Sequence, residues 1–124
     1  MLRNSSKSGA QAEQLALDYL LAQGLKLLER NFRTRRGEID LIMRDNDKLV
    51  FVEVRFRQGS RFGSAEESIT LQKCQRLTAA AEAYMQRQKL TDHISARFDA
   101  VAISPVPVKS DSGCRINWIK NILQ

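Results

Sequence analysis

Two acidic side chains interrupt a segment that otherwise reads as a buried β-hairpin. Residues 37–57 are rich in apolar side chains on both sides of a short polar break. If Asn46 and Asp47 form a two-residue loop, Asp40 lies opposite Glu53 in the hairpin. Directly opposed side chains have Cβ atoms about 5 Å apart, and like charges at that separation repel each other. The pair therefore predicts a site that holds a cation.

The distribution of apolar residues supports this register. One face of the hairpin then carries only apolar side chains, whereas a shift by one residue would mix them with charges. The apolar face consists of Ile39, Leu41, Met43, Val50, Val52, Val54 and Phe56. The other face carries Glu38, Asp40, Glu53, Arg55 and Arg57, with Glu38 opposite Arg55.

A hard divalent ion, Mg²⁺ or Mn²⁺, is the cation that best suits two carboxylates. Mg²⁺ takes oxygen ligands and is commonly held by one or two carboxylates, with water and substrate phosphate completing its octahedron. Such an ion can activate water and stabilise a leaving oxygen. The alternative is a solvated charged face in which Glu38 and Arg55 form an ion pair. The apolar strands around the acids and the basic residue that follows Glu53 favour the metal site.

An Asp on one strand followed by Glu-x-basic on the next resembles the PD-(D/E)XK superfamily of restriction-endonuclease-like nucleases. Asp40 matches the Asp of that motif, and residues 53–55 match its second part. With further matching residues, the chain over residues 9–123 is similar to the uncharacterised bacterial YraN family. Those residues are Gly9, Glu13, Asn31, Phe32, Arg33, residues 37–42 and 52–55, Lys73, Arg76, Leu77 and residues 97–99. The resemblance implies a fold shared with archaeal Holliday junction resolvases and tRNA endonucleases.

Arg55 departs from the superfamily pattern, which usually has lysine there to orient or deprotonate the attacking water. Arginine can stabilise charge but cannot lose a proton in a protein. In related nucleases the lysine sometimes lies on a neighbouring element, so Lys73 is the candidate substitute, with a solvated helix residue as the alternative. The resemblance also implies that Glu13, on the first helix, contributes to the metal site. An exposed helix residue is the alternative for Glu13.

Basic residues flank the acidic hairpin. The net charge is +6, and arginines lie just before and just after the hairpin, at Arg33, Arg35, Arg36, Arg57 and Arg61. Cations around an acidic centre are expected where phosphates must be drawn to a metal ion, although a solvated basic loop is the alternative. The predicted partner is nucleic acid, and the resemblance puts DNA ahead of RNA. Phe32 and Phe62, in the same basic segments, are candidates for stacking on bases.

The order of the remaining elements predicts an α/β fold. Ser8 and Gln11 resemble a capping box for a helix that ends at Gly24, after a flexible tail of residues 1–8. A second helix over residues 71–88 follows a cap at Thr70. Its buried stripe is predicted to consist of Leu77, Ala80, Ala81, Tyr84 and Met85.

Strands are predicted at residues 97–103 and 115–119, the latter at an edge of the sheet. We therefore expect a single nuclease-like domain over residues 9–124. The elements predict a mixed sheet of four to five strands flanked by helices, and the resemblance implies that this sheet is restriction-endonuclease-like. Asp99 is interpreted as structural, and His93 as a surface residue.

No segment resembles a signal peptide, and no apolar run approaches the about 18 residues of a membrane span. We expect a cytoplasmic protein in which Cys74 and Cys114 are reduced. Two functions fit the sequence. The first is a metal-dependent nuclease acting on structured or branched DNA, where symmetric cutting of two strands would require a homodimer. The second is a nucleic-acid-binding module that kept the nuclease fold with little or no catalysis.

Overall fold

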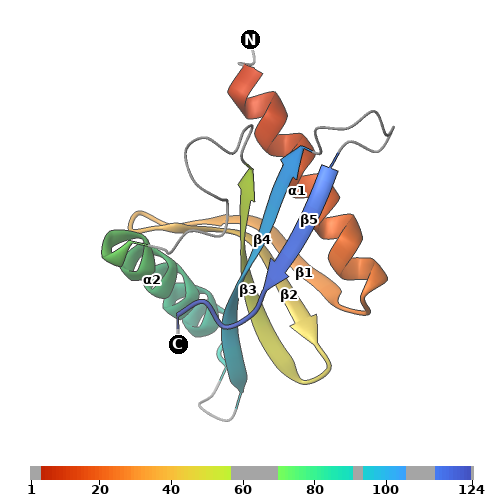
Figure 1. The fold of residues 1–124 in the computed structure, drawn as a ribbon. Coiled ribbons are helices and arrows are strands. Elements are labelled where there is room, and N and C mark those ends of the chain that lie inside the picture. The colour runs from red at the N-terminus through yellow and green to blue at the C-terminus, as the bar shows by residue number, and fades with distance from the viewer. Residues whose placement is uncertain (1–3, 57–69, 91–93, 106–113, 124) are drawn as a thin grey trace.

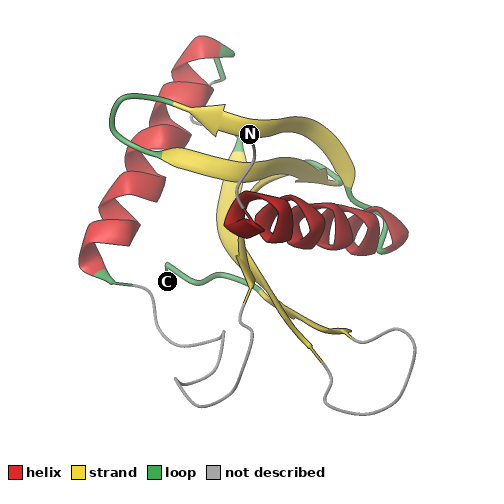
Figure 2. Ribbon diagram, turned by 90° about the horizontal axis from the view of Figure 1, so that it is seen from above, coloured by secondary structure: helices red, strands yellow, loops and turns green. Residues whose placement is uncertain are grey.

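The computed structural model describes residues 4–56, 70–90, 94–105 and 114–123. In chain order, the elements are α1 (Asn4–Ala22), β1 (Lys26–Arg33), β2 (Glu38–Asp45), β3 (Lys48–Phe56), α2 (Leu71–Arg87), β4 (Ser95–Pro105) and β5 (Cys114–Ile119). The strands form one sheet in the order β1-β2-β3-β4-β5 (Figure 1). The view from above in Figure 2 shows α1 and α2 on opposite faces of this sheet.

The sheet is mixed, as predicted for an α/β fold. Strands β1, β2 and β3 pair antiparallel in sequence, and β4 pairs antiparallel with β5 at the edge. Strands β3 and β4 are parallel, so the chain between them must cross over one face of the sheet. Helix α2 lies in that crossover connection. The predicted fold class is confirmed.

The predicted register of the acidic hairpin is confirmed over the part of the hairpin that pairs. It runs from Asp45 opposite Lys48 to Leu41 opposite Val52. The predicted pairs Asp40–Glu53 and Glu38–Arg55 lie beyond this stretch. Glu38 lies opposite Arg33 of β1, and its Oε1 is 3.4 Å from Arg33 Nε, whereas its pairing with Arg55 across the hairpin stays a prediction.

Strand β1 is the element that the sequence interpretation missed, because its residues read as a basic loop. Seven of its eight side chains are exposed or only half-buried, and Phe32 alone is buried. The register with β2 shifts between Leu27 and Glu29, and Asn31 has a φ of +52°, so no regular alternation is present. An edge strand is held mainly by backbone hydrogen bonds to one neighbour and needs few apolar side chains.

Phe32 packs in the protein interior and is not a base-stacking residue. The residue is 2% exposed, and its ring lies edge-on to that of Tyr84 of α2, with 5.3 Å between ring centroids. The Arg87 guanidinium lies 4.9 Å from the centroid of the same ring. The stacking prediction for Phe32 is therefore wrong, because its basic neighbours in the sequence concealed an inward-facing strand position.

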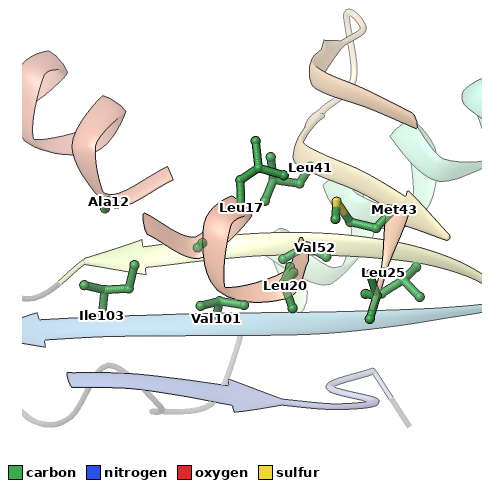
Figure 3. Close-up of a cluster of buried hydrophobic side chains, with 11 residues drawn as sticks. Ala12, Leu17, Leu20, Leu25, Leu41, Met43, Val52, Val101 and Ile103 are labelled. Carbon is green, nitrogen blue, oxygen red and sulfur yellow. The ribbon is translucent and has the colours of Figure 1, made fainter. Parts of the chain in front are cut away.

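Each face of the sheet has its own apolar cluster. Helix α1 covers the first cluster, where Leu17 and Leu20 extend toward Leu41, Val52 and Val101 of the strands (Figure 3). Helix α2 covers the second cluster, which contains its Leu77, Ala80, Ala81 and Tyr84 with Ile42 and Phe51. The predicted buried stripe of α2 is thus confirmed, with Met85 partly buried at its border.

Ile39 belongs to the second cluster, although the alternating pattern predicted it beside Leu41 in the first. The change of face falls at Asp40. There the register with β3 ends and β2 continues beside β1. A strand that leaves one neighbour can twist away from it, so strict alternation no longer assigns its residues to faces.

The helix ends agree with the sequence in α2 and differ in α1. The Thr70 side chain accepts a hydrogen bond from the Lys73 amide at 3.1 Å, which confirms the predicted cap, and Gln88 is the C-cap. Helix α1 begins at Asn4, so residues 4–8 are helical instead of forming a tail capped by Ser8. Serine and lysine cost a helix interior well below 1 kcal/mol each, so such residues do not force a helix to start late.

Asp99 is fully buried in β4, where it has a structural role. Its carboxylate accepts hydrogen bonds from Arg97 Nε, from Trp118 Nε1 at 2.9 Å and from the Asn121 amide at 3.0 Å. These contacts join β4, β5 and the segment after β5. Arg97 also donates to Asp45 Oδ2 at 3.2 Å and so connects β4 to the end of β2.

Several predictions fall on residues that the structure does not describe. Arg57, Arg61, Phe62 and His93 lie outside the described residues. Cys74 and Cys114 are both free thiols. In the described part of the chain, neither helix is long and apolar enough to cross a membrane.

Gly37 allows α2 to approach the turn between β1 and β2. A Cβ atom at residue 37 would lie 2.8 Å from the backbone carbonyl carbon of Arg76, and its oxygen would be closer still. Real Cβ atoms do not reach backbone atoms so closely, so any other residue would push α2 away from the turn. By contrast, a Cβ atom at Gly9 in α1 would meet nothing within 4 Å.

We predict that Gly37→Ala destabilises the protein by about 1–3 kcal/mol, the usual cost of overpacking. Gly9→Ala is the matched control. It should stabilise the protein by up to about 1 kcal/mol, because alanine is the better helix former. Urea unfolding followed by circular dichroism measures both free energies. Equal effects of the two substitutions would contradict the close approach at Gly37.

Candidate metal and phosphate site

A hollow of about 570 Å³ opens where the β1–β2 turn, the ends of β2 and β3, and the start of α2 meet. It brings together six of the predicted site residues, which are Arg33, Arg35, Arg36, Asp40, Glu53 and Lys73. The remaining lining residues are Thr34, Gly37, Glu38, Val54, Arg76 and Leu77. Carboxylates and basic side chains from β1, β2, β3 and α2, and from the β1–β2 turn, therefore share one hollow.

The Asp40 carboxylate is fixed by the neighbouring strand. Its Oδ2 accepts a hydrogen bond of 2.7 Å from the backbone amide of Val54, just beyond the paired part of β2 and β3. Burial raises the pKa of Asp40 from 3.8 to about 6, although the Val54 hydrogen bond lowers it. The charges of Glu13, Glu53 and Glu38 add smaller increases to this pKa. Asp40 thus lies within the electrostatic reach of three other acids.

Glu53 is a buried acid with basic neighbours on two sides. Its exposed fraction is 7%, and Lys73 Nζ of α2 lies 2.7 Å from its Oε2. Arg55 Nη2 lies 3.7 Å from Oε1, which is too far for a hydrogen bond. Among the described residues, Oε1 is buried without a hydrogen-bond partner. This oxygen is therefore available to a further ligand.

Glu13 joins α1 to β1. Its Oε1 accepts hydrogen bonds from Arg30 Nη2 at 3.1 Å and from Asn31 Nδ2 at 3.2 Å, and its side chain is 13% exposed. Glu13 does not line the hollow, although its charge raises the pKa of Asp40. The alternative of an exposed helix residue is wrong, and the metal-ligand role of Glu13 stays a prediction.

The β1–β2 turn presents arginines at the rim of the hollow. Thr34 Oγ1 accepts hydrogen bonds from the amides of Arg36 and Gly37, both at 3.1 Å, and donates to the Gly37 carbonyl oxygen at 3.0 Å. Arg35 and Arg36 are exposed on this turn. Arg33 is also exposed but lies at the end of β1, beside Glu38. The predicted basic loop is therefore a strand end followed by an ordered turn.

Arg76 and Val54 are site residues that the sequence interpretation did not assign. Arg76 follows Lys73 by three residues on α2, a spacing that puts both side chains on one helix face and could have identified it. Val54 contributes its backbone amide, which no side-chain pattern reveals. Arg55, which was assigned, contacts Glu53 but is not among the residues that line the hollow.

The donor set fits a divalent ion held by two carboxylates. Asp40 and Glu53 both line the hollow, and Glu53 Oε1 lacks a hydrogen-bond donor among the described residues. In the described ranges, no group of three His, Cys, Asp or Glu side chains is close enough to hold a metal. Water and phosphate oxygens would therefore complete the coordination, as is usual for Mg²⁺.

Comparison with known proteins identifies the family. The sequence profile of the uncharacterised protein family UPF0102 matches residues 12–103. The chain belongs to UPF0102. A UPF0102 protein of Nitrosococcus oceani is 49% identical over 91% of this chain and 88% of its own length. A UPF0102 protein of Methylococcus capsulatus is 45% identical over 94% of this chain and 90% of its own length. One of Stutzerimonas stutzeri is 42% identical over 99% of this chain and 99% of its own length.

Membership in UPF0102 confirms the resemblance to the YraN-like family that the motifs indicated. The alignments with these relatives cover 90% and 99% of the relatives' own lengths. The family description states no activity.

The raised pKa of Asp40 makes the stability of this UPF0102 protein depend on pH. Because the folded-state pKa of about 6 exceeds the ordinary 3.8, the native state retains a proton that the unfolded state has lost between these values. Stability in the absence of metal should fall as pH rises from 4 to 7, by at most about 3 kcal/mol from this group. Asp40→Asn keeps an acceptor for the Val54 amide and should remove that loss.

The measurement is urea unfolding of the wild type and Asp40→Asn from pH 4 to 8, with a chelator present. The variant's gain in stability over the wild type should grow through this range. Parallel curves would contradict the burial of an ionisable Asp40.

Proposed function

We propose that this protein is a divalent-metal-dependent nuclease that hydrolyses phosphodiester bonds in structured or branched DNA. The observation that carries the proposal is the 2.7 Å contact between Lys73 Nζ and Glu53 Oε2, in a hollow that Asp40 also lines. Two acids and a lysine are the side chains that PD-(D/E)XK nucleases use. In this protein the lysine is Lys73 of α2. It takes the place of the motif lysine, because position 55 holds an arginine.

Each side chain has a distinct role in this proposal. Asp40 and Glu53 hold the divalent ion, which when bound activates water and stabilises the leaving oxygen. Lys73 has a half-exposed side chain, so its ammonium can neutralise the charge of a phosphate in the hollow. Arg55 adds positive charge beside Glu53 and cannot serve as a base.

The basic rim is proposed to bind the nucleic-acid backbone. Arg35, Arg36 and Arg76 are exposed around the hollow and can bind phosphates on either side of the reacting one. Such contacts position a duplex without reading its sequence. The preference for branched DNA and a homodimer rests on the resemblance to resolvases.

Arg55 is the observation that favours a second function, a nucleic-acid-binding module with little or no catalysis. Its guanidinium stands near Glu53 where the superfamily has a lysine. If Lys73 serves only as a partner for Glu53, the basic rim still binds phosphates while hydrolysis fails. The two functions share the binding surface and differ only in cleavage.

We predict that the wild type cleaves DNA with Mg²⁺ or Mn²⁺ and that Lys73→Ala lowers the rate by about 100-fold, a usual loss when a group that stabilises transition-state charge is removed. Asp40→Asn should abolish cleavage, and Arg55→Lys should add little. Lys48→Ala is the control, because Lys48 is exposed at the hairpin loop and does not line the hollow. The assay uses four-way, flap, single-stranded and linear duplex DNA, and RNA.

Two outcomes would redirect the proposal. A large gain from Arg55→Lys would make position 55 the limiting defect. If no variant cleaves any substrate while all still bind DNA, the nuclease is excluded and the binding module is supported.

We also predict that nucleic-acid affinity falls steeply with salt. Replacing Arg33, Arg35 and Arg36 by Gln should flatten the slope of log K against log salt by about 0.9 for each phosphate of B-DNA that the variant no longer binds. The matched control replaces three exposed cations outside the hollow, Arg44, Lys48 and Lys89, and so changes the net charge equally. Fluorescence anisotropy with labelled duplexes measures both slopes. Equal slopes for the two triple variants would show that the rim is not the binding surface.

A further inference from the structure

The ion pair between Lys73 and Glu53 is unequal in its burial. The Glu53 side chain is 9% exposed, whereas the Lys73 side chain is 53% exposed. Lys73 can therefore leave the pair and remain in water, but Glu53 would keep only the longer contact with Arg55, at 3.7 Å, and its buried charge would need a further cation. The pair can separate at low cost only if a second cation takes the place of Lys73.

The backbone around Lys73 is fixed, so only its side chain has to move. The Lys73 amide donates to the Thr70 cap at 3.1 Å, and the following turn of α2 lies against Gly37 at Arg76. The lysine side chain extends from this anchored turn to the wall of the hollow. A change of side-chain rotamer can thus move the ammonium between Glu53 and the open part of the hollow.

A divalent ion and Lys73 compete for the same carboxylate. Glu53 Oε1 is the oxygen without a hydrogen-bond donor in the described residues, and Lys73 is bound to Oε2 of the same group. The two oxygens of a carboxylate are about 2 Å apart, so an ion on Oε1 would repel both the Lys73 ammonium and the Arg55 guanidinium, which lies 3.7 Å from Oε1. Lys73 is the more exposed of the two and is the one that can move into water. The nearby charge of Asp40 attracts either cation.

We propose that Lys73 is an exchangeable internal counterion of Glu53. It neutralises the buried carboxylate without metal, and it is displaced from Glu53 when a divalent ion binds, so its ammonium becomes free for a substrate phosphate. A phosphate that draws Lys73 away would strengthen metal binding, and metal would strengthen phosphate binding by the same factor. This inference rests on the proposed metal site and adds to it a coupling between the two ligands.

The test compares metal affinity in three proteins by calorimetric titration with Mn²⁺. Lys73→Met, which keeps the length of the side chain without its charge, should bind Mn²⁺ about tenfold more tightly than the wild type. Arg76→Met removes one charge from the same face of α2 but leaves the contact between Lys73 and Glu53 in place. Its gain in Mn²⁺ affinity should therefore be smaller than that of Lys73→Met. Circular dichroism and thermal unfolding establish that all three proteins are folded.

A second measurement follows Lys73 itself. The ¹H–¹³C NMR signal of its Cε group, assigned by its loss in Lys73→Met, should shift as Mg²⁺ is added. The shift should saturate with the occupancy that Mg²⁺ calorimetry gives. Binding that is detectable only in Lys73→Met would also support the exchange.

The outcomes separate this inference from the proposed function. If neither the wild type nor Lys73→Met binds Mn²⁺ at millimolar concentration, the metal site is excluded and the exchange with it. If Lys73→Met binds with equal or lower affinity and the Lys73 signal does not shift, the metal site stands. Lys73 is then a fixed support for Glu53, and the exchange is excluded.

Discussion

A carboxylate inside a protein costs several kcal/mol unless cations or hydrogen-bond donors surround it, and Glu53 is 7% exposed in the middle strand of a five-stranded sheet. Its neighbours are arranged to meet that cost. Lys73 reaches Glu53 from α2, and α2 can lie close enough because residue 37 has no Cβ atom. The charge of one strand residue thus constrains how the helix, the β1–β2 turn and the hairpin pack together.

The face of the sheet under α2 is divided between apolar packing and charge. Toward the hairpin loop, Ile42 and Phe51 pack against the buried stripe of the helix. Toward the other end of β3, the register with β2 ends, and Asp40 uses its carboxylate to hold the Val54 amide. The hollow forms at this boundary, where the strands no longer share a regular ladder. The same helix therefore covers an apolar cluster and borders a polar site.

The sequence was sufficient where a residue's role depends on its near neighbours in the chain. Alternation and the two-residue loop predicted the hairpin register, and Thr70 predicted the start of α2. It was insufficient where the role depends on distant packing. Strand β1 is held by its partner strand more than by apolar side chains, so it read as a loop and the ion pair between Arg33 and Glu38 was not predicted. Lys73 was identified by resemblance, but its contact with Glu53 depends on how α2 crosses the sheet.

The parallel pairing of β3 with β4 has a consequence for the order of folding. The β2–β3 hairpin contains both acids and pairs locally, and hairpins form within about 1–10 μs. The crossover that carries Lys73 needs contacts between distant parts of the chain, which form later. We therefore expect Asp40 and Glu53 to stay solvated until α2 packs on the sheet, so that the desolvation of the acids and the closure of the parallel sheet occur together.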